Sequence, residues 1–146
     1  MLKAGFIERF ARFSEWPHEL SMDTFKIKVI GHSPFGGALE KMFAKVKVQD
    51  RPVSIEYVSS IADIEDCQIL FISDSESKHV ESIINQVSSK PVLTIGETKG
   101  YIDKGVIVNF YETSKGTVHF EISKTSIKNS KVKMDIKLLG YAKLVE

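Results

Sequence analysis

The chain has 146 residues, of which 42% are apolar and 27% charged, and its formal net charge is +1. The length predicts one domain of ordinary globular composition, residues 1–146. A near-neutral charge excludes a dedicated nucleic-acid-binding protein, and no apolar run approaches the roughly 18 residues of a membrane-spanning helix.

The first segment, residues 1–15, carries apolar residues at helical spacing. Phe6, Phe10 and Phe13 fall on one stripe, which predicts an amphipathic helix packed on the rest of the fold. Pro17 ends this helix, because proline disfavours helical geometry in the residue before it. That residue is Trp16, and the sequence leaves open whether its large ring fills the core or contacts a partner.

Two strands with a helix between them follow in the next part of the chain. Residues 24–31 alternate apolar and basic and then become fully apolar, which indicates a strand entering a sheet. Residues 34–45 are expected to form a helix that begins at a proline. Arg51 and Pro52 are expected to break the chain before a half-buried strand at 53–58, and residues 59–66 to form a short helical turn.

The strand at residues 67–73 is apolar on both faces, so it must be covered on both. Residues 78–89 then read as a helix and residues 91–96 as a second buried strand, which together form a right-handed β-α-β unit. Cys67 is the only cysteine, so no disulfide can form within the chain, and its place in a core strand favours a small buried hydrophobe.

The last third of the chain changes pattern. Strands at residues 106–111 and 117–122 are joined by so few residues that they must be antiparallel. Residues 124–134 are polar, and Asp135 is expected to cap a final helix. The apolar side of that helix would be formed by Leu138, Leu139, Ala142 and Val145. The predicted fold is a three-layer α/β sandwich, a Rossmann-like mixed sheet with parallel core strands and an antiparallel C-terminal hairpin.

One possible ligand mouth lies where predicted strands end. A doubly wound fold places a phosphate loop after its first strand, but the turn at residues 31–37 has neither a dinucleotide fingerprint nor a P-loop. The residues that would line a small-ligand mouth are Gly31, Ser33, Ser73 and Gly96. Asp74, Glu76 and Glu97 stand nearby in the chain; they fit a metal or proton-transfer site, or the more common roles of helix caps and solvated loops.

Catalytic patterns are otherwise missing from the sequence. No Gly-x-Ser-x-Gly nucleophile elbow occurs, and the four histidines and one cysteine do not have zinc-ligand spacing. We therefore expect no catalytic residues, no metal and no cofactor. The alternative that stays open is a doubly wound enzyme whose cofactor site has no motif.

Several stretches in order resemble the YfiR-like family of small periplasmic proteins. They are the aromatic helix running into Trp-Pro at 6–17, the strand and glycine turn at 27–31, the strands at 67–72, 91–95, 105–110 and 120–122, and the closing Leu138, Leu139 and Ala142. The resemblance spans nearly the whole chain. This chain departs from the family in two places. Residues 129–134 lack the Gly-Leu pair of the family, and Cys67 is a single cysteine where some members carry cysteine pairs.

The resemblance implies a regulator and not an enzyme. It implies a periplasmic protein, whose leader peptide is absent from the printed sequence, that binds the periplasmic part of an inner-membrane diguanylate cyclase. Binding would repress the cyclase and so lower cyclic-di-GMP signalling and biofilm formation. A homodimer is expected, with no nucleic-acid partner and no membrane span of its own.

A docking surface is predicted on the final helix. From Lys124 onward six lysines stand against Asp135 and Glu146, a net charge of +4 that suits an acidic partner. Apolar anchors with a polar rim are typical of interface hot spots. The predicted partner-binding residues are Tyr141, Leu144 and Val145, with Lys137 and Lys143 at the rim and Trp16 as a separate candidate. The alternative is that these residues pack the helix onto the sheet, and the alternative function is a periplasmic small-ligand sensor.

Overall fold

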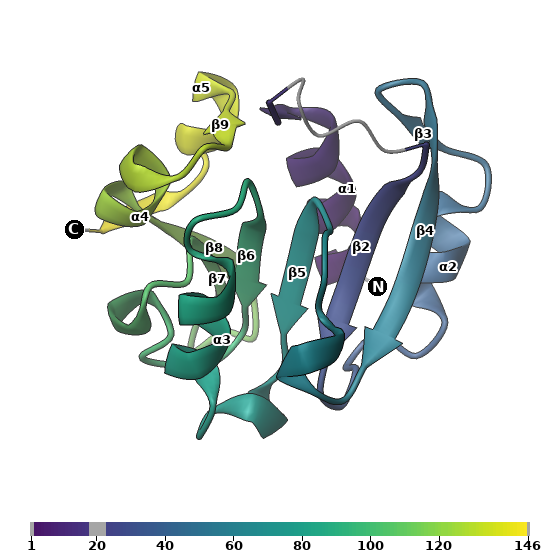
Figure 1. Ribbon diagram of the computed structural model, residues 1–146. Helices are drawn as coiled ribbons and strands as arrows, with labels where there is room; N and C mark the ends of the chain where they lie inside the picture. The colour runs from purple at the N-terminus through teal and green to yellow at the C-terminus, as the bar shows by residue number, and fades with distance from the viewer. Residues whose placement is uncertain (1, 18–22, 146) are drawn as a thin grey trace.

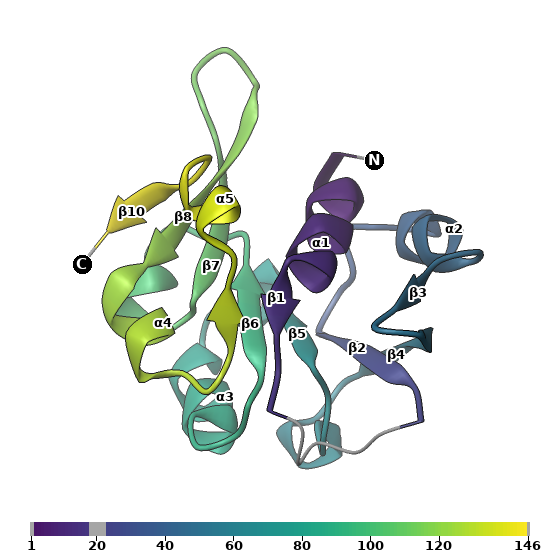
Figure 2. The same cartoon turned by 90° about the horizontal axis from the view of Figure 1, so that it is seen from above.

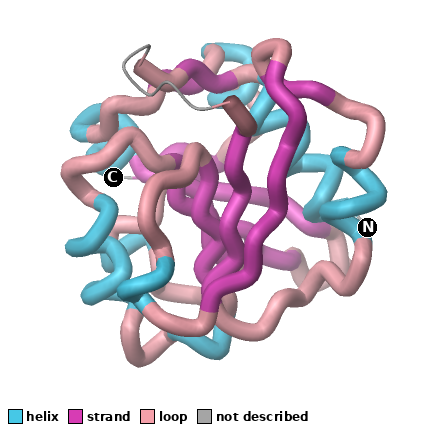
Figure 3. Tube along the Cα trace, turned by 45° about the vertical axis from the view of Figure 1, so that its right-hand side comes forward, coloured by secondary structure: helices cyan, strands magenta, loops and turns pink. Residues whose placement is uncertain are grey.

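Strand β5 (Ile69–Ile72) lies inside the sheet, and all four of its residues are buried. It pairs in parallel with β2 (Phe25–Ile30) on one side and with β6 (Leu93–Gly96) on the other. The computed structural model describes residues 2–17 and 23–145, of which 2, 136 and 139 are described by their backbone alone. The strands form the middle layer of a three-layer sandwich with helices on both sides (Figures 1 and 3). The predicted fold class and the central position of this strand are confirmed.

In the described residues the main sheet has eight strands in the order β10-β8-β7-β6-β5-β2-β4-β3. The parallel part, β4-β2-β5-β6-β7, has the strand order of flavodoxin-like doubly wound folds. Strands β7 and β8 form the predicted antiparallel hairpin, whose turn reaches away from the sheet in Figure 2. The remaining bounds are β3 (Lys47–Val48), β4 (Arg51–Val58), β7 (Val108–Glu112), β8 (Val118–Ser123) and β10 (Lys143–Val145), with a separate antiparallel pair of β1 (Ser14–Glu15) and β9 (Lys133–Met134).

Helices cover the two faces unequally. Figure 2 shows α1 (Leu2–Arg12) and α2 (Ala38–Phe43) on one face of the sheet and α3 (Val80–Val87) on the other. The shorter elements are α4 (Lys124–Asn129), α5 (Ile136–Leu139), and the 3₁₀ turns η1 (Ile61–Asp63), η2 (Asp74–Glu76) and η3 (Ile102–Lys104). The expected helices at 34–45 and 78–89 are therefore present but shorter at both ends, because turns flank each of them.

The aromatic stripe of α1 forms part of the larger core cluster. Phe10 is fully buried, and its ring lies 4.9 Å from that of Phe120 and 6.0 Å from that of Phe110. The ring of Phe6 packs beside the rings of Phe10 and Phe120, so Phe6 belongs to the same aromatic cluster. Helix α1 therefore joins the two strands of the C-terminal hairpin to the rest of the fold.

The expected break at Arg51 and Pro52 is wrong, because both residues belong to β4. They pair with β3 across a turn in which Gln49 and Asp50 both have left-handed backbone angles, φ 53° and 63°. Two such residues form the kind of turn that matches the twist of a two-residue hairpin. Proline is tolerated near the start of a strand, so Pro52 does not end the pairing.

The prediction of a long final helix is also wrong. The helix α5 covers only four residues, and residues 143–145 form β10, which pairs in parallel with β8. The physical reason is that β8 would otherwise leave its outer backbone groups without a strand partner. The polar stretch after β8 likewise contains the helix α4, which Ser123 caps by accepting a hydrogen bond from the Ser126 amide at 3.1 Å.

Candidate functional site

The crevice of a doubly wound fold lies at the carboxyl ends of the strands where their order reverses, here between β2 and β5. Gly31 ends β2 there with a left-handed φ of 93°. A Cβ atom on Gly31 would collide with the hydroxyls of Ser73 and Ser75. These two hydroxyls are 2.8 Å apart, and that of Ser75 also accepts a hydrogen bond from the His32 amide at 3.0 Å. The side chain of Ser75 therefore occupies the space above Gly31.

The neighbouring strand end is filled in a similar way. Tyr101 is buried, and its hydroxyl donates to the carbonyl of Ser73 at 2.7 Å. Its ring lies so close to Gly96 that a Cβ atom there would stand 2.5 Å from the ring. Burial is the main cause that raises the pKa of Tyr101, so the hydroxyl stays protonated as a donor.

The structure thus brings Gly31, Ser73 and Gly96 to neighbouring strand ends, as the small-ligand hypothesis expects. The hydroxyl of Ser33 accepts from the amide of Phe35 at 3.2 Å in a local turn. The space that a ligand would need beside the two glycines is taken by side chains of the protein itself.

Two of the three nearby carboxylates, Asp74 and Glu97, have local partners. Asp74 accepts a hydrogen bond from the Thr98 hydroxyl at 2.9 Å. Glu97 forms an ion pair with Lys3 at 2.9 Å, and both side chains are largely buried. Within residues 2–17 and 23–145, no group of three or more histidine, cysteine or acidic side chains is placed to hold a metal ion.

The single thiol is also unsuited to chemistry. Cys67 is buried, and burial raises the pKa of its thiol to about 12 from an ordinary value of 9.0. A thiol that keeps its proton at neutral pH is a poor nucleophile and a poor metal ligand. Cys67 therefore packs as a small hydrophobe in the core beneath α3.

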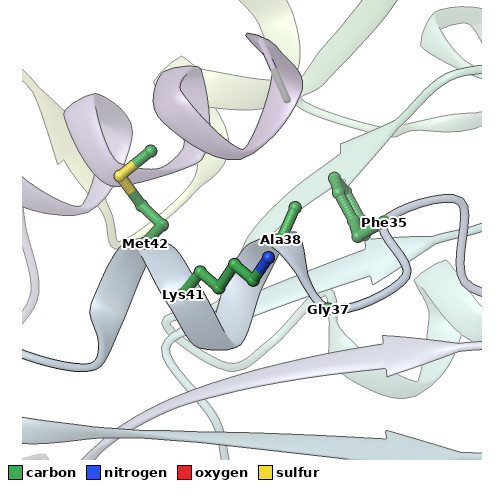
Figure 4. A pocket seen from close by; sticks show the side chains of 5 residues that line it. All are labelled: Phe35, Gly37, Ala38, Lys41 and Met42. Atoms are coloured by element: carbon green, nitrogen blue, oxygen red, sulfur yellow. The ribbon is translucent and has the colours of Figure 1, made fainter.

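A hollow of about 540 Å³ lies on α2, as Figure 4 shows. It is lined by Phe35, Gly37, Ala38, Lys41 and Met42. In the figure the Met42 side chain points toward α1. The lining has one cation and no general base, so this hollow does not have the groups of a catalytic site.

Trp16 is a core residue, which corrects its place among the partner-binding candidates. Only 8% of it is exposed, and its ring meets that of Phe25 edge-on at 5.1 Å. Its Nε1–H donates to the carbonyl of Gln68 at 3.0 Å. This hydrogen bond and the packing account for a tryptophan directly after β1 without any contact to another protein.

The most exposed aromatic side chain among the described residues lies at the C-terminal edge of the sheet. Tyr141 is 81% exposed, and Leu144 on the edge strand β10 is 44% exposed. Lys143 places its ammonium 5.9 Å from the ring centroid of Tyr111, which stacks on His119 at 5.8 Å. The register puts Leu144 on the face of the sheet that α1 covers, and Lys143, Tyr111 and His119 on the other face. We call these five residues at the edge, Tyr111, His119, Tyr141, Lys143 and Leu144, the C-terminal patch.

Three of the predicted partner-binding residues, Tyr141, Lys143 and Leu144, belong to the C-terminal patch and are exposed. Of the other predicted residues, Lys137 in α5 is exposed and Val145 in β10 is half-buried. Tyr111 and His119 were missed, although they face each other in the hairpin register. Counting cross-strand pairs outward from the hairpin turn could have predicted the pair of Tyr111 and His119 from the sequence.

Comparison with known proteins gives a family and a fold. The family model described as YfiR/HmsC-like matches residues 1–143. The crystal structure of a conserved domain protein from Vibrio cholerae O1 biovar El Tor str. N16961 is similar, with a TM-score of 0.67 and 12% sequence identity. The alignment covers 98% of this chain and 60% of that chain. At this identity the similarity shows the fold alone.

No curated protein matches the sequence. Among the described residues, no helix has both the length and the apolar character needed to span a membrane.

Proposed function

Because the chain belongs to the YfiR/HmsC-like family, whose members are periplasmic regulators in the diguanylate cyclase pathway and not enzymes, we propose that it represses such a cyclase by binding it. The partner would be the periplasmic part of the membrane-bound cyclase. Binding holds the cyclase inactive and so lowers cyclic-di-GMP and biofilm formation. The proposal also includes export directed by a leader peptide and assembly into a homodimer. Light scattering on the purified protein measures the oligomeric state.

The observation that carries this proposal is the exposure of Tyr141, at 81%, beside the edge strand β10. Tyrosine is enriched in interface hot spots, because its ring buries a large area at a small cost in conformational entropy. Leu144 adds an exposed aliphatic side chain from the same segment. Contiguous exposed apolar patches mark sites where another protein binds, and the proposal takes Tyr141 and Leu144 to belong to one such site.

The charge of the C-terminal segment also supports docking of the partner at this edge of the sheet. The segment from residue 124 onward has six lysines and two acidic residues. Lys137 and Lys143 are both exposed, so they can meet carboxylates at the rim of an interface. We therefore expect an acidic surface on the partner.

The test replaces Tyr141 or Leu144 by aspartate and measures cyclic-di-GMP in cells that lack the native copy. The exported unmodified protein should lower cyclic-di-GMP, and Tyr141→Asp and Leu144→Asp should not. Lys78→Asp is the control, because Lys78 is exposed on the loop before α3, outside the C-terminal patch.

Circular dichroism on each purified variant establishes that it is folded. If folded Tyr141→Asp and Leu144→Asp lower cyclic-di-GMP as well as Lys78→Asp does, the C-terminal patch is not the docking surface.

A further inference from the structure

The opposite edge of the sheet has backbone groups without partners. The carbonyl of Val58 in β4 accepts a hydrogen bond from the Gly31 amide at 3.2 Å, so the backbone of Val58 points toward β2. Backbone groups alternate in direction along a strand. The amides and carbonyls of Val53, Ile55 and Tyr57 therefore point away from β2, toward the outside of the sheet.

Strand β3 covers only the beginning of this edge. It pairs with Arg51 and Pro52 and then leaves toward α2. Pro52 has no N–H, so its pairing with Lys47 depends on the flanking pair of Val46 and Val53, and Val46 therefore covers the outward side of Val53. Beyond that point, the outward backbone groups of Ile55 and Tyr57 make no hydrogen bond to any described part of the chain. At roughly 3.3 Å per residue, the open length from Ile55 to Tyr57 is about 7 Å.

A groove runs beside these groups, with a volume of about 400 Å³. Helix α2 contributes Phe43 from above, and the segment after it contributes Val46, which is 36% exposed. Strand β4 contributes Val53 and Ile55, which are only half-buried. An added strand would thus meet unpaired backbone groups on one side and an apolar wall on one face.

The charges at the groove select for an acidic occupant. Lys45 and Lys47 line it and are exposed. The carboxylate of Glu40, which also lines it, accepts a hydrogen bond from the Tyr57 hydroxyl at 2.5 Å. The acidic group is therefore engaged within the protein, while the two lysines can meet carboxylates from outside.

We propose that the free edge of β4 binds an extended segment of a partner protein as an added strand, with apolar side chains alternating with acidic ones. The backbone groups bind the main chain, the groove takes alternate apolar side chains, and Lys45 and Lys47 pair with carboxylates. This site is at the edge opposite the C-terminal patch, so it goes beyond the proposed function.

A single segment fits this edge better than a second copy of the chain. Twofold pairing through β4 would bring both α2 helices onto the same face, above two strands about 4.8 Å apart. Packed helices need an axial distance of about 8–10 Å. A lone peptide brings no helix with it.

The test uses the peptide acetyl-Glu-Val-Asp-Ile-Glu-Val-Asp-amide and nuclear magnetic resonance of the full chain. We expect saturating peptide to shift the amide signals of Ile55 and Tyr57 and to slow their hydrogen exchange about tenfold or more. Two further peptides separate strand addition from simple apolar contact. One is N-methylated at its three apolar residues and the other at its four acidic residues, so each lacks one alternate set of backbone N–H donors. Strand addition requires that only one of the two N-methylated peptides binds, because alternate amides face β4.

Two variants probe the groove from the side of the protein. Ile55→Pro removes an outward amide while the amides that pair with β2 remain, and should weaken binding about tenfold. Lys45→Glu combined with Lys47→Glu changes only exposed side chains, so it keeps the test valid if Ile55→Pro does not fold. Lys78→Glu is the matched charge-reversal control and should bind the peptide as the unmodified chain does.

The inference is overturned if neither groove variant weakens binding, if both N-methylated peptides bind alike, or if the signals of β4 do not respond. It is also overturned if sedimentation shows a dimer that Ile55→Pro dissolves, since a second copy would then occupy the edge. None of these outcomes changes the cyclic-di-GMP measurement on Tyr141→Asp, so the two proposals fail separately.

Discussion

Replacing Gly31 by alanine tests whether the crevice between β2 and β5 is filled as described. Gly31 and Gly100 both have a φ of 93°, a left-handed conformation in which a Cβ atom costs about 1–2 kcal/mol. Nothing lies within 4 Å of a Cβ atom added to Gly100. Gly100→Ala therefore measures the backbone cost alone.

At Gly31 the added Cβ atom also meets other atoms. It would collide with the hydroxyls of Ser73 and Ser75 and stand 2.8 Å from Cγ of Glu76. Overpacking of this kind costs about 1–3 kcal/mol, and displacing Ser75 removes hydrogen bonds worth about 1 kcal/mol each. We expect Gly31→Ala to lose about 4–7 kcal/mol of unfolding free energy, against about 1–2 kcal/mol for Gly100→Ala.

Urea unfolding followed by circular dichroism measures both losses, and the slope m should stay constant while the midpoint falls. Adding Ser75→Gly to Gly31→Ala should recover part of the loss, because it removes one of the colliding hydroxyls. Equal losses at Gly31 and Gly100 would refute the reasoning: the space above Gly31 would then be open, and the small-ligand hypothesis would regain its site.

Two further predictions concern the core. Phe10→Ala should lose about 3–5 kcal/mol in the same urea assay, because the fully buried ring packs on Phe110 and Phe120; a loss below about 1 kcal/mol would contradict the packing of α1. Burial raises the pKa of the Cys67 thiol to about 12 from 9.0, so its contribution to stability is complete below pH 9 and is lost as the pH rises toward 12. The urea midpoint of the unmodified chain should therefore fall more between pH 8 and about pH 10.5 than that of Cys67→Ala, and parallel curves would show that the thiol is accessible in the folded state.

The sequence was most informative where burial is continuous. The strand at 69–72 is apolar at every position, and only a place between two layers of helices buries both of its faces. The hairpin of β7 and β8 was equally readable, because its connection is too short for any other pairing.

Elements that depend on a distant partner were misjudged. Ala142 and Val145 fit a helical stripe and an edge strand equally well, and only the free side of β8 decides between them. The turn at Gln49 and Asp50 contains no glycine, so the hairpin of β3 and β4 had no local signal.

Local pattern alone thus determined the buried strands, the first helix and the C-terminal hairpin, because hydrophobic periodicity acts within a few neighbouring residues. Only the tertiary structure decided that Trp16 belongs to the core, that Tyr141 stands exposed beside β10, and that β4 keeps an open edge. Those three outcomes depend on which backbone groups and which faces remain unpaired once the whole sheet has formed, and that is a property of the assembled fold.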